Sequence, residues 1–178
     1  MKKKIIFLDG DGTIWYPKAT KRTVKPHWIY HDIETKDNYL AHLELTPGTE
    51  KTITELKKRG MYIVVISANP YAEDIAIEEI KERLNYFNLT QHILSIRSSP
   101  GDDPKGKAAI ILEILNALKF NKEDALMVGD SYYYDYLAIK DVGVDSLWIE
   151  NGVSKLPETM PKDLKSVKEI NELLDILI

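Results

Sequence analysis

The stretch IIFLDGDGTIW, residues 5–15, decides the fold of this chain. Its unbroken apolar run is typical of a strand that is covered on both faces of a parallel sheet, so we predict a buried strand at 4–8. Successive side chains on extended backbone alternate in direction, and Asp9 and Asp11 therefore point the same way. Two carboxylates that face one spot repel each other unless a cation or a shared proton joins them. The strand is thus expected to end in a charged site, although Asp-Gly pairs also form simple tight turns.

Length and composition narrow the class of protein. The chain has 178 residues and a net charge of −4, which fits one domain over 1–178 and gives no global attraction for nucleic acid or a membrane surface. No apolar run approaches the roughly 18 residues that a membrane helix needs. The sequence holds no cysteine, which excludes disulfides and thiolate metal sites and fits a cytoplasmic protein. Many Lys, Glu and Ile residues and a single glutamine, Gln91, favour a thermostable protein.

Strands and helices alternate along the rest of the chain. Further strands are predicted at 61–67, 92–98, 125–130 and 144–149. Helices are predicted from Thr46-Pro47 to Arg59, from Asn69-Pro70 onward, from Asp103-Pro104 to Leu118, and over 167–178. This alternation predicts an α/β protein with a three-layer α/β/α Rossmann-like core and a parallel sheet of about five strands. Residues 16–45 are irregular, polar and aromatic, and we expect an insertion there.

Polar side chains follow the predicted strands. They are Asp9 and Asp11 after the first strand, Ser67 and Asn69 after the second, and Asp130 and Asp135 after the fourth. In a parallel sheet these ends meet at one rim, which is where ligands bind. Three or four carboxylates gathered at one rim require a divalent cation. An all-oxygen ligand set suits Mg²⁺, which usually completes its shell with phosphate oxygens.

Two lysines lie at the start of the helix that leads to the fourth strand. A cation in the first helical turn is disfavoured by the helix dipole, so Lys105 and Lys107 are better explained if an anion lies nearby. A solvated side chain is the alternative for one of the two. Ser67 has a similar pair of interpretations, because it either caps the next helix or binds an anion at a helix N-terminus.

Together these features resemble the haloacid dehalogenase-like (HAD) phosphohydrolase superfamily. The four motifs of that family are matched in order by FLDGDGT at 7–13, IVVIS at 63–67, a lysine at 105 or 107, and GDSYYYD at 129–135. Each motif alone is weak, but the four together are specific and span most of the chain. The tryptophan directly after DGDGTI and the short insertion look most like the capless magnesium-dependent phosphatase branch. The resemblance therefore implies a small flap at 16–45 and no large cap domain.

The resemblance implies a mechanism for hydrolysing a phosphomonoester with Mg²⁺. Asp9 would be the nucleophile that forms an aspartyl-phosphate, and Asp11 would protonate the leaving oxygen and then activate water. The ion would be held by Asp9, the backbone carbonyl of Asp11, and Asp130, with Asp135 nearby in support. Aspartate at position 11 favours a phosphatase that turns over, and a phosphotransferase or phosphomutase is the alternative within the family.

The resemblance gives phosphate binding to Ser67, Asn69 and a lysine. Lys107 is narrowly favoured, because its spacing from Asp130 suits many relatives. Lys105 stays open, because it sits in a KG context that also occurs at this motif. The substrate would be a phosphorylated small molecule or a phosphoprotein. A homodimer is a further option, with the run YYYDY at 132–136 as its surface.

The insertion allows more than one interpretation. Its aromatic residues either line a substrate entrance or anchor a flap against the body of the protein. These residues are Tyr16, Trp28, Tyr30 and Tyr39. The insertion also carries three histidines, which make a zinc site the alternative interpretation. They are His27, His31 and His42.

A phospho-receiver signalling module is the alternative from a different functional class. A receiver carries two adjacent acids after its first strand and an acceptor aspartate after its third. Here the first pair is spaced as D-x-D, and the third strand runs into IRSSPG without an acid. Catalytic turnover would separate the two classes.

Overall fold

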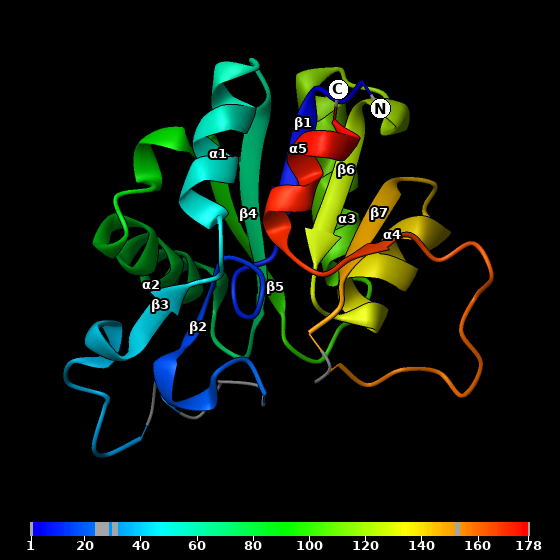
Figure 1. The fold of residues 1–178 in the computed structure, drawn as a ribbon. Helices are drawn as coiled ribbons and strands as arrows, with labels where there is room; N and C mark the ends of the chain where they lie inside the picture. Colours follow the sequence, from blue (N-terminus) through cyan, green and yellow to red (C-terminus); the bar gives the residue numbers. More distant parts are fainter. Residues whose placement is uncertain (1, 24–28, 30–31, 152–153, 178) are drawn as a thin grey trace.

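The computed structural model describes residues 2–23, 29, 32–151 and 154–177. A six-stranded parallel sheet forms its centre, in the order β5-β4-β1-β6-β7-β8 (Figure 1). The strands are β1 (Ile5–Leu8), β4 (Tyr62–Asn69), β5 (Ser95–Pro100), β6 (Ala125–Gly129), β7 (Asp145–Ile149) and β8 (Ser166–Val167). The predicted α/β architecture is confirmed, with one more strand than expected.

The central strand β1 explains why the opening stretch is apolar without a break. It pairs with β4 on one side and β6 on the other. Ile6 and Leu8 pack into the core on one face of the sheet, while Ile5 and Phe7 pack into the core on the other. Each of these side chains is fully buried. Burial of one such side chain stabilises the fold by about 1.5–3 kcal/mol, so a polar residue here would be costly.

Helices cover both faces of the sheet (Figure 1). One face carries α1 (Thr49–Lys58), α2 (Glu73–Tyr86) and α5 (Leu173–Ile176), which contribute Ile53, Ile80 and Leu173 to one core. The other face carries α3 (Gly106–Leu118) and α4 (Ala138–Asp141), which contribute Ile111 and Ile139 to the second core. Because the strands between these layers are parallel, their carboxyl ends lie at the same rim.

Three helices begin later than predicted, namely α1, α2 and α3, and the first two show why. The N-cap of α1 is Gly48, in the left-handed region at φ 80°, rather than Thr46. The Thr46 hydroxyl instead donates to the Thr13 carbonyl at 2.6 Å, which ties it to the loop after β1. Asn69 ends β4, and its side chain accepts a hydrogen bond from the Tyr71 backbone amide at 3.0 Å. Both polar residues are used by tertiary contacts and turns, so the helices start beyond them.

The insertion after β1 contains a small antiparallel pair. Strands β2 (Trp15–Pro17) and β3 (Leu43–Leu45) lie side by side, where the sequence predicts irregular chain. The Tyr39 hydroxyl donates to Glu82 of α2, so this aromatic anchors the flap. The His42 ring lies 3.2 Å from the Asn38 side-chain oxygen. The predictions for Trp28, Tyr30, His27 and His31 fall outside the described residues.

The predicted C-terminal helix over 167–178 is too long, because helical turns form only from Ile170 to Ile176. Val167 belongs to β8 and pairs with Ile149, and the chain then makes a single tight turn before the four residues of α5. The apolar positions are nevertheless buried, including Ile170, Leu173 and Leu177. The apolar spacing predicted which side chains enter the core. The start of the segment, however, pairs with the edge of β7 and forms a strand instead of a helix. Within the described part of the chain, no helix is both long and apolar enough to cross a membrane.

Candidate active site

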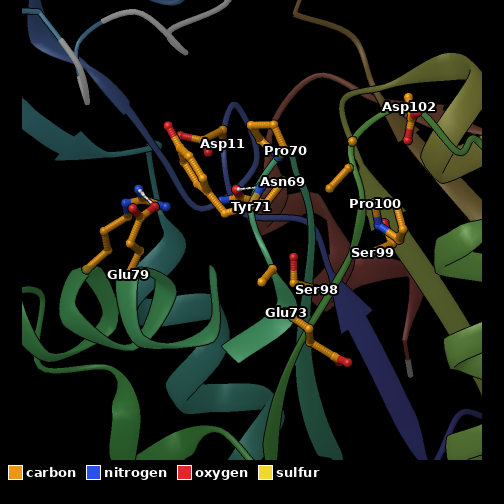
Figure 2. Close-up of a pocket in the computed structure, with 14 residues that line it drawn as sticks. Asp11, Asn69, Pro70, Tyr71, Glu73, Glu79, Ser98, Ser99, Pro100 and Asp102 are labelled. Carbon is orange, nitrogen blue, oxygen red and sulfur yellow. Dashed lines mark hydrogen bonds and ion pairs between the residues drawn. The ribbon is translucent and has the colours of Figure 1, made fainter. Parts of the chain in front are cut away.

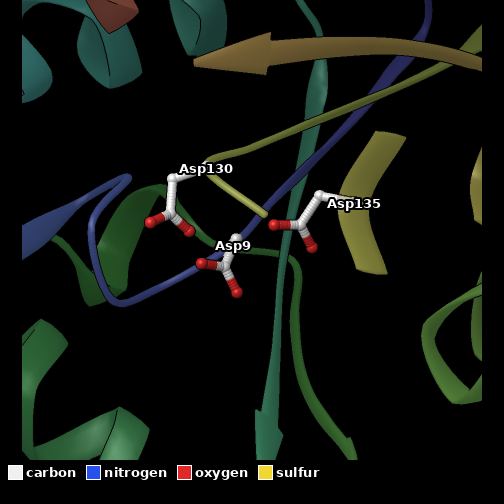
Figure 3. A group of neighbouring side chains, drawn as sticks. All are labelled: Asp9, Asp130 and Asp135. Carbon is white, nitrogen blue, oxygen red and sulfur yellow. The ribbon is translucent and has the colours of Figure 1, made fainter. Parts of the chain in front are cut away.

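Three carboxylates from separate segments meet at the rim of the sheet. Asp9 follows β1, Asp130 follows β6, and Asp135 lies in the π-helical turn Tyr132–Leu137. One carboxylate oxygen of each lies within 4.8 Å of the others. Figure 3 shows the three side chains gathered at this place. All three side chains are buried. Such a cluster is electrostatically unfavourable unless positive charge is placed beside it.

Lys107 supplies part of that charge. Its Nζ lies 2.5 Å from Asp9 Oδ1 and 2.6 Å from Asp135 Oδ1, and the residue is only 2% exposed. Burial alone would lower the pKa of Lys107, but the carboxylates of Asp135 and Asp9 raise it above its ordinary value. The lysine is therefore charged. Lys105 is exposed and lies away from the cluster's ion pairs, so the helix brings only one of the two lysines into the site.

The Asp135 carboxylate is fully occupied by neighbours. One oxygen accepts from Lys107, and the other accepts from the Ser131 backbone amide at 2.9 Å. Burial raises the pKa of Asp135, and nearby Asp9 adds to this, while Lys107 opposes it. The Asp135 carboxylate also packs directly against the backbone of Gly129. A Cβ on Gly129 would lie 2.3 Å from the Asp135 carboxyl carbon. Glycine before Asp130 is thus required by packing.

Asp130 is held by residues that the sequence patterns did not indicate. Its backbone carbonyl accepts from the Trp148 indole at 2.9 Å and from the Ser154 hydroxyl. Its Oδ2 accepts from the Asn151 side-chain amide. Trp148 lies in β7 and Asn151 lies just after it. Asn151 follows the predicted strand at 144–149, so the rule that strand ends meet at one rim is the signal that could have found it.

Asp11 is positioned by a buried tryptophan. The Trp15 indole nitrogen donates to Asp11 Oδ1 at 3.0 Å, and the ring of Trp15 is fully buried. A Cβ on Gly10 would lie 2.8 Å from that ring, so glycine at this position makes room for it. The loop after β1 therefore places Asp11 against a rigid aromatic donor.

The cluster lines a small pocket of about 180 Å³. Asp11, Ser67 and Tyr134 are also part of its wall, and the Tyr134 hydroxyl donates to the Gly101 carbonyl at 3.0 Å. Asn69 is absent from the residues that line this pocket. It lines the neighbouring cavity instead, so it lies outside the wall that surrounds Asp9, Asp130 and Asp135.

The neighbouring cavity is larger, at about 790 Å³, and we call it the side groove. It lies between the carboxyl ends of β4 and β5 and the first turns of α2, as Figure 2 shows. It shares Asp11, Ala68 and Gly101 with the small pocket. The two cavities therefore meet at Asp11.

Comparison with known families decides what kind of protein this is. Residues 3–149 match the family model of haloacid dehalogenase-like hydrolases. The chain belongs to the haloacid dehalogenase-like hydrolase family. The matched region includes the residues of the small pocket, so the carboxylate cluster lies within the part that defines this family.

Several curated relatives of this haloacid dehalogenase-like hydrolase are named phosphatases. A glyceraldehyde 3-phosphate phosphatase from Pyrococcus furiosus is 29% identical over 161 residues, which covers 85% of this chain and 62% of the relative. An acid sugar phosphatase from Staphylococcus haemolyticus is 32% identical over 111 residues, which covers 60% of this chain and 41% of the relative. The chain thus spans only about half the length of these relatives.

Solved structures share the fold over the whole chain. A protein from Listeria monocytogenes superposes with a TM-score of 0.75 at 20% identity, covering 98% of this chain and 96% of the other. A putative phosphatase from Clostridium difficile gives 0.73 at 21% identity and covers both chains completely. At this identity the likeness concerns the fold.

Proposed function

We propose that this hydrolase is a Mg²⁺-dependent phosphatase that hydrolyses a phosphomonoester through an aspartyl-phosphate on Asp9. The observation that carries the proposal is the position of the Asp9 carboxylate, which lies beside the Lys107 ammonium and within 4.8 Å of Asp130 and Asp135. An attacking carboxylate needs positive charge nearby, because the phosphoryl group that it approaches is negative.

The residues present fit a magnesium ion. The donors at the rim are carboxylate oxygens, which Mg²⁺ prefers, and they come from three segments of the chain. Asp9, Asp130 and the backbone carbonyl of Asp11 would hold the ion. Asp135 would not bind the ion directly, since both of its oxygens already accept hydrogen bonds, and it would instead hold Lys107 in place beside Asp9. When bound, Mg²⁺ would offset the charge of the phosphoryl oxygens.

The first half-reaction would use Asp9 and Asp11. An oxygen of Asp9 attacks phosphorus, the bond from phosphorus to the leaving oxygen breaks, and Asp11 transfers its proton to that oxygen. An alcohol and an aspartyl-phosphate result. In the second half-reaction Asp11 takes a proton from a water molecule, which attacks phosphorus and releases phosphate from Asp9. Splitting one hard displacement into two is the advantage of a covalent intermediate.

Ser67 and Lys107 would bind the phosphoryl oxygens. Both line the small pocket with Asp9, and Ser67 is buried at the end of β4. The backbone carbonyl of Ser67 accepts from the Ser98 hydroxyl at 3.2 Å, which fixes the end of β4 beside β5. Because the transition state spreads charge over the phosphoryl oxygens, fixed donors at these positions stabilise it.

The relatives favour a phosphorylated small molecule as substrate. Two of them carry the names glyceraldehyde 3-phosphate phosphatase and acid sugar phosphatase. The volume of the side groove lies within the roughly 300–1,000 Å³ of small-molecule sites, which agrees with this choice over a phosphoprotein.

The test is to trap the intermediate. Wild-type protein with p-nitrophenyl phosphate and Mg²⁺ is quenched in acid, and the peptide that contains Asp9 is examined for a phosphoryl adduct by mass spectrometry. Asp9→Asn abolishes adduct and turnover, Asp11→Asn slows turnover and increases the adduct, and the exposed control Asp175→Asn behaves as wild type. Hydrolysis that persists in Asp9→Asn or in excess chelator contradicts the proposal.

A further inference from the structure

The small pocket cannot hold a whole substrate. Its volume of about 180 Å³ is below the roughly 300–1,000 Å³ of sites that enclose small molecules. It is lined by the nucleophile, the carboxylate cluster and Lys107, all of which concern the phosphoryl group. The remainder of the substrate must therefore extend into a neighbouring space.

Asp11 identifies that space. As the proton donor in the proposed reaction, Asp11 must face the leaving oxygen, so the leaving alcohol lies on the side of the pocket that Asp11 occupies. Asp11 is one of three residues that line both the small pocket and the side groove. The side groove therefore receives the leaving group.

We propose that the side groove selects an uncharged, hydroxyl-bearing leaving group and rejects one that carries a second negative charge. The inference rests on the proposed phosphatase function and specifies its substrate class. It follows from the charges and the hydrogen-bonding groups that line the groove, which Figure 2 shows.

The lining is predominantly acidic. Four carboxylate residues and a single cationic residue contribute to it, namely Asp11, Glu73, Glu79, Asp102 and Arg83. Arg83 is buried, and its guanidinium forms an ion pair with Glu79 at 3.2 Å, so its charge is offset inside the groove itself. A second anion on the substrate would thus meet excess negative charge without an uncommitted cation among the described lining residues.

The acids at the groove mouth differ in how far they are neutralised. Glu73 pairs with Arg97 at 2.8 Å, which screens its charge. Asp102 is exposed on the loop after β5 and forms no ion pair with any residue in the described part of the chain. Outside the proposed catalytic residues, Asp102 is therefore the groove acid whose charge is least offset by an ion pair, and it is exposed enough to be changed without disturbing packing.

The neutral part of the lining suits a small polyhydroxylated group. Asn69 and Ser98 carry polar side chains, while Pro70 and Pro100 offer apolar surface and Tyr71 offers a partly exposed ring. Hydroxyl groups can both donate to carboxylates and accept from amides, whereas a carboxylate or phosphate can only accept. Acidic walls therefore match hydroxyl donors by chemistry as well as by charge.

A matched pair of substrates tests the inference. Glycerol 3-phosphate and 3-phosphoglycerate differ mainly in that one carries a terminal hydroxymethyl group where the other carries a carboxylate. At low ionic strength we expect kcat/KM to be at least roughly tenfold higher for glycerol 3-phosphate. One unit charge at about 8 Å in water changes affinity by roughly two- to threefold, and several acids act together. The preference shrinks at high salt, because exposed charges are screened.

Charge reversal at the groove mouth provides the second measurement. Asp102→Lys is expected to lower the preference for glycerol 3-phosphate by roughly fivefold, since it removes one negative charge and adds one positive charge. Glu158→Lys is the matched control, because Glu158 is an exposed acid on the segment between β7 and β8, outside the groove lining. It leaves the preference unchanged.

The outcomes separate this inference from the function on which it rests. If p-nitrophenyl phosphate is hydrolysed in an Asp9-dependent manner but 3-phosphoglycerate is used as well as glycerol 3-phosphate, the groove inference is wrong and the phosphatase proposal stands. The groove inference is also wrong if Asp102→Lys and Glu158→Lys shift the preference equally. If p-nitrophenyl phosphate is not hydrolysed at all with Mg²⁺, the phosphatase proposal fails first.

Discussion

Lys107 joins Asp9 to Asp135, with its Nζ at 2.5 Å from an oxygen of the first and 2.6 Å from an oxygen of the second. Asp9 lies at the end of β1 and Asp135 in the turn after β6, so one buried ammonium connects two neighbouring strands with the helix α3. A buried charge of this kind is tolerated only because its partners are equally buried and correctly placed. The ion pairs thus fix the position of the Asp9 carboxylate, the proposed nucleophile.

Replacing Lys107 by methionine should therefore be severe. Removing one partner leaves the carboxylates of Asp9 and Asp135 buried without their counter-charge, which typically costs about 3–5 kcal/mol. Urea unfolding measures this loss, and phosphatase activity should fall to background. Lys105→Met is the control, because Lys105 is exposed two positions earlier and its replacement should change the free energy of unfolding by less than about 0.5 kcal/mol. Equal losses in the two variants would contradict this account of Lys107.

The bond from Trp15 to Asp11 predicts an effect that depends on the leaving group. Trp15→Phe removes the indole donor that orients Asp11. An alkyl alcohol needs a proton to leave, whereas p-nitrophenolate leaves without one. We expect kcat for glycerol 3-phosphate to fall roughly tenfold, a part of the 10²–10⁴ that acid–base groups supply, and kcat for p-nitrophenyl phosphate to fall much less.

Trp148→Phe is the comparison for that variant. Trp148 also donates an indole hydrogen bond in the site, but to the backbone carbonyl of Asp130. Its replacement should affect both substrates to the same degree, because it does not touch the proton donor. A uniform loss in Trp15→Phe as well would show that Trp15 acts only through packing.

Gly129 predicts a steric effect on the cluster. A Cβ at this position would lie 2.3 Å from the Asp135 carboxyl carbon, so Gly129→Ala must displace Asp135. Overpacking of this kind costs about 1–3 kcal/mol, and the loss of Asp135 from Lys107 should reduce activity as well. Thermal unfolding and steady-state assays measure the two effects.

Gly60→Ala separates backbone strain from this clash. Gly60 lies at φ +79°, and a Cβ added there would meet no atom within 4 Å, so alanine costs about 1 kcal/mol through strain alone. Its kcat should remain that of the wild type. If Gly129→Ala retains full activity, Asp135 does not need its present position.

Asn151 predicts a change in metal affinity. Its side-chain amide donates to Asp130, a proposed Mg²⁺ ligand, and removal of an outer partner of a metal ligand typically weakens metal binding 10- to 100-fold. In Asn151→Ala the Mg²⁺ concentration for half-maximal activity should rise by roughly tenfold, while activity at saturating Mg²⁺ returns toward wild type. Asn116→Ala, on the exposed face of α3, should leave the Mg²⁺ dependence unaltered. An unchanged Mg²⁺ requirement in Asn151→Ala would show that Asn151 does not contribute to Mg²⁺ binding.

Some features of the fold could be predicted from the sequence because they are local. Four apolar residues before Asp9 predict a strand buried on both faces, and β1 is such a strand. The rule that parallel strands end at one rim then brings Asp9, Asp130 and Asp135 together, and the structure does so. In these cases the apolar periodicity predicts the strand and the chain direction predicts where it ends. Neither depends on which other segment packs beside it.

Other features could not be predicted from local pattern. Asn69 looks like a phosphate ligand by position, but its side chain is engaged by the Tyr71 amide and lines the side groove. The tail carries helical spacing, but Val167 pairs with the edge of β7 and becomes a strand. In both places the contacts that the folded chain offers compete with the local preference.

The sequence by itself therefore determined five strands of the sheet, their polarity and the set of acids at its rim, because these follow from alternation and burial along one strand at a time. Only the tertiary structure decided between Lys107 and Lys105, because that choice depends on which turn of α3 faces the ends of β1 and β6. It likewise supplied Trp15 and Asn151 as the donors to Asp11 and Asp130. Asn151 lies 21 residues from Asp130, so their hydrogen bond is set by packing in three dimensions. The bond from Trp15 to Asp11 spans only four residues, but it depends on how the loop after β1 folds against the core.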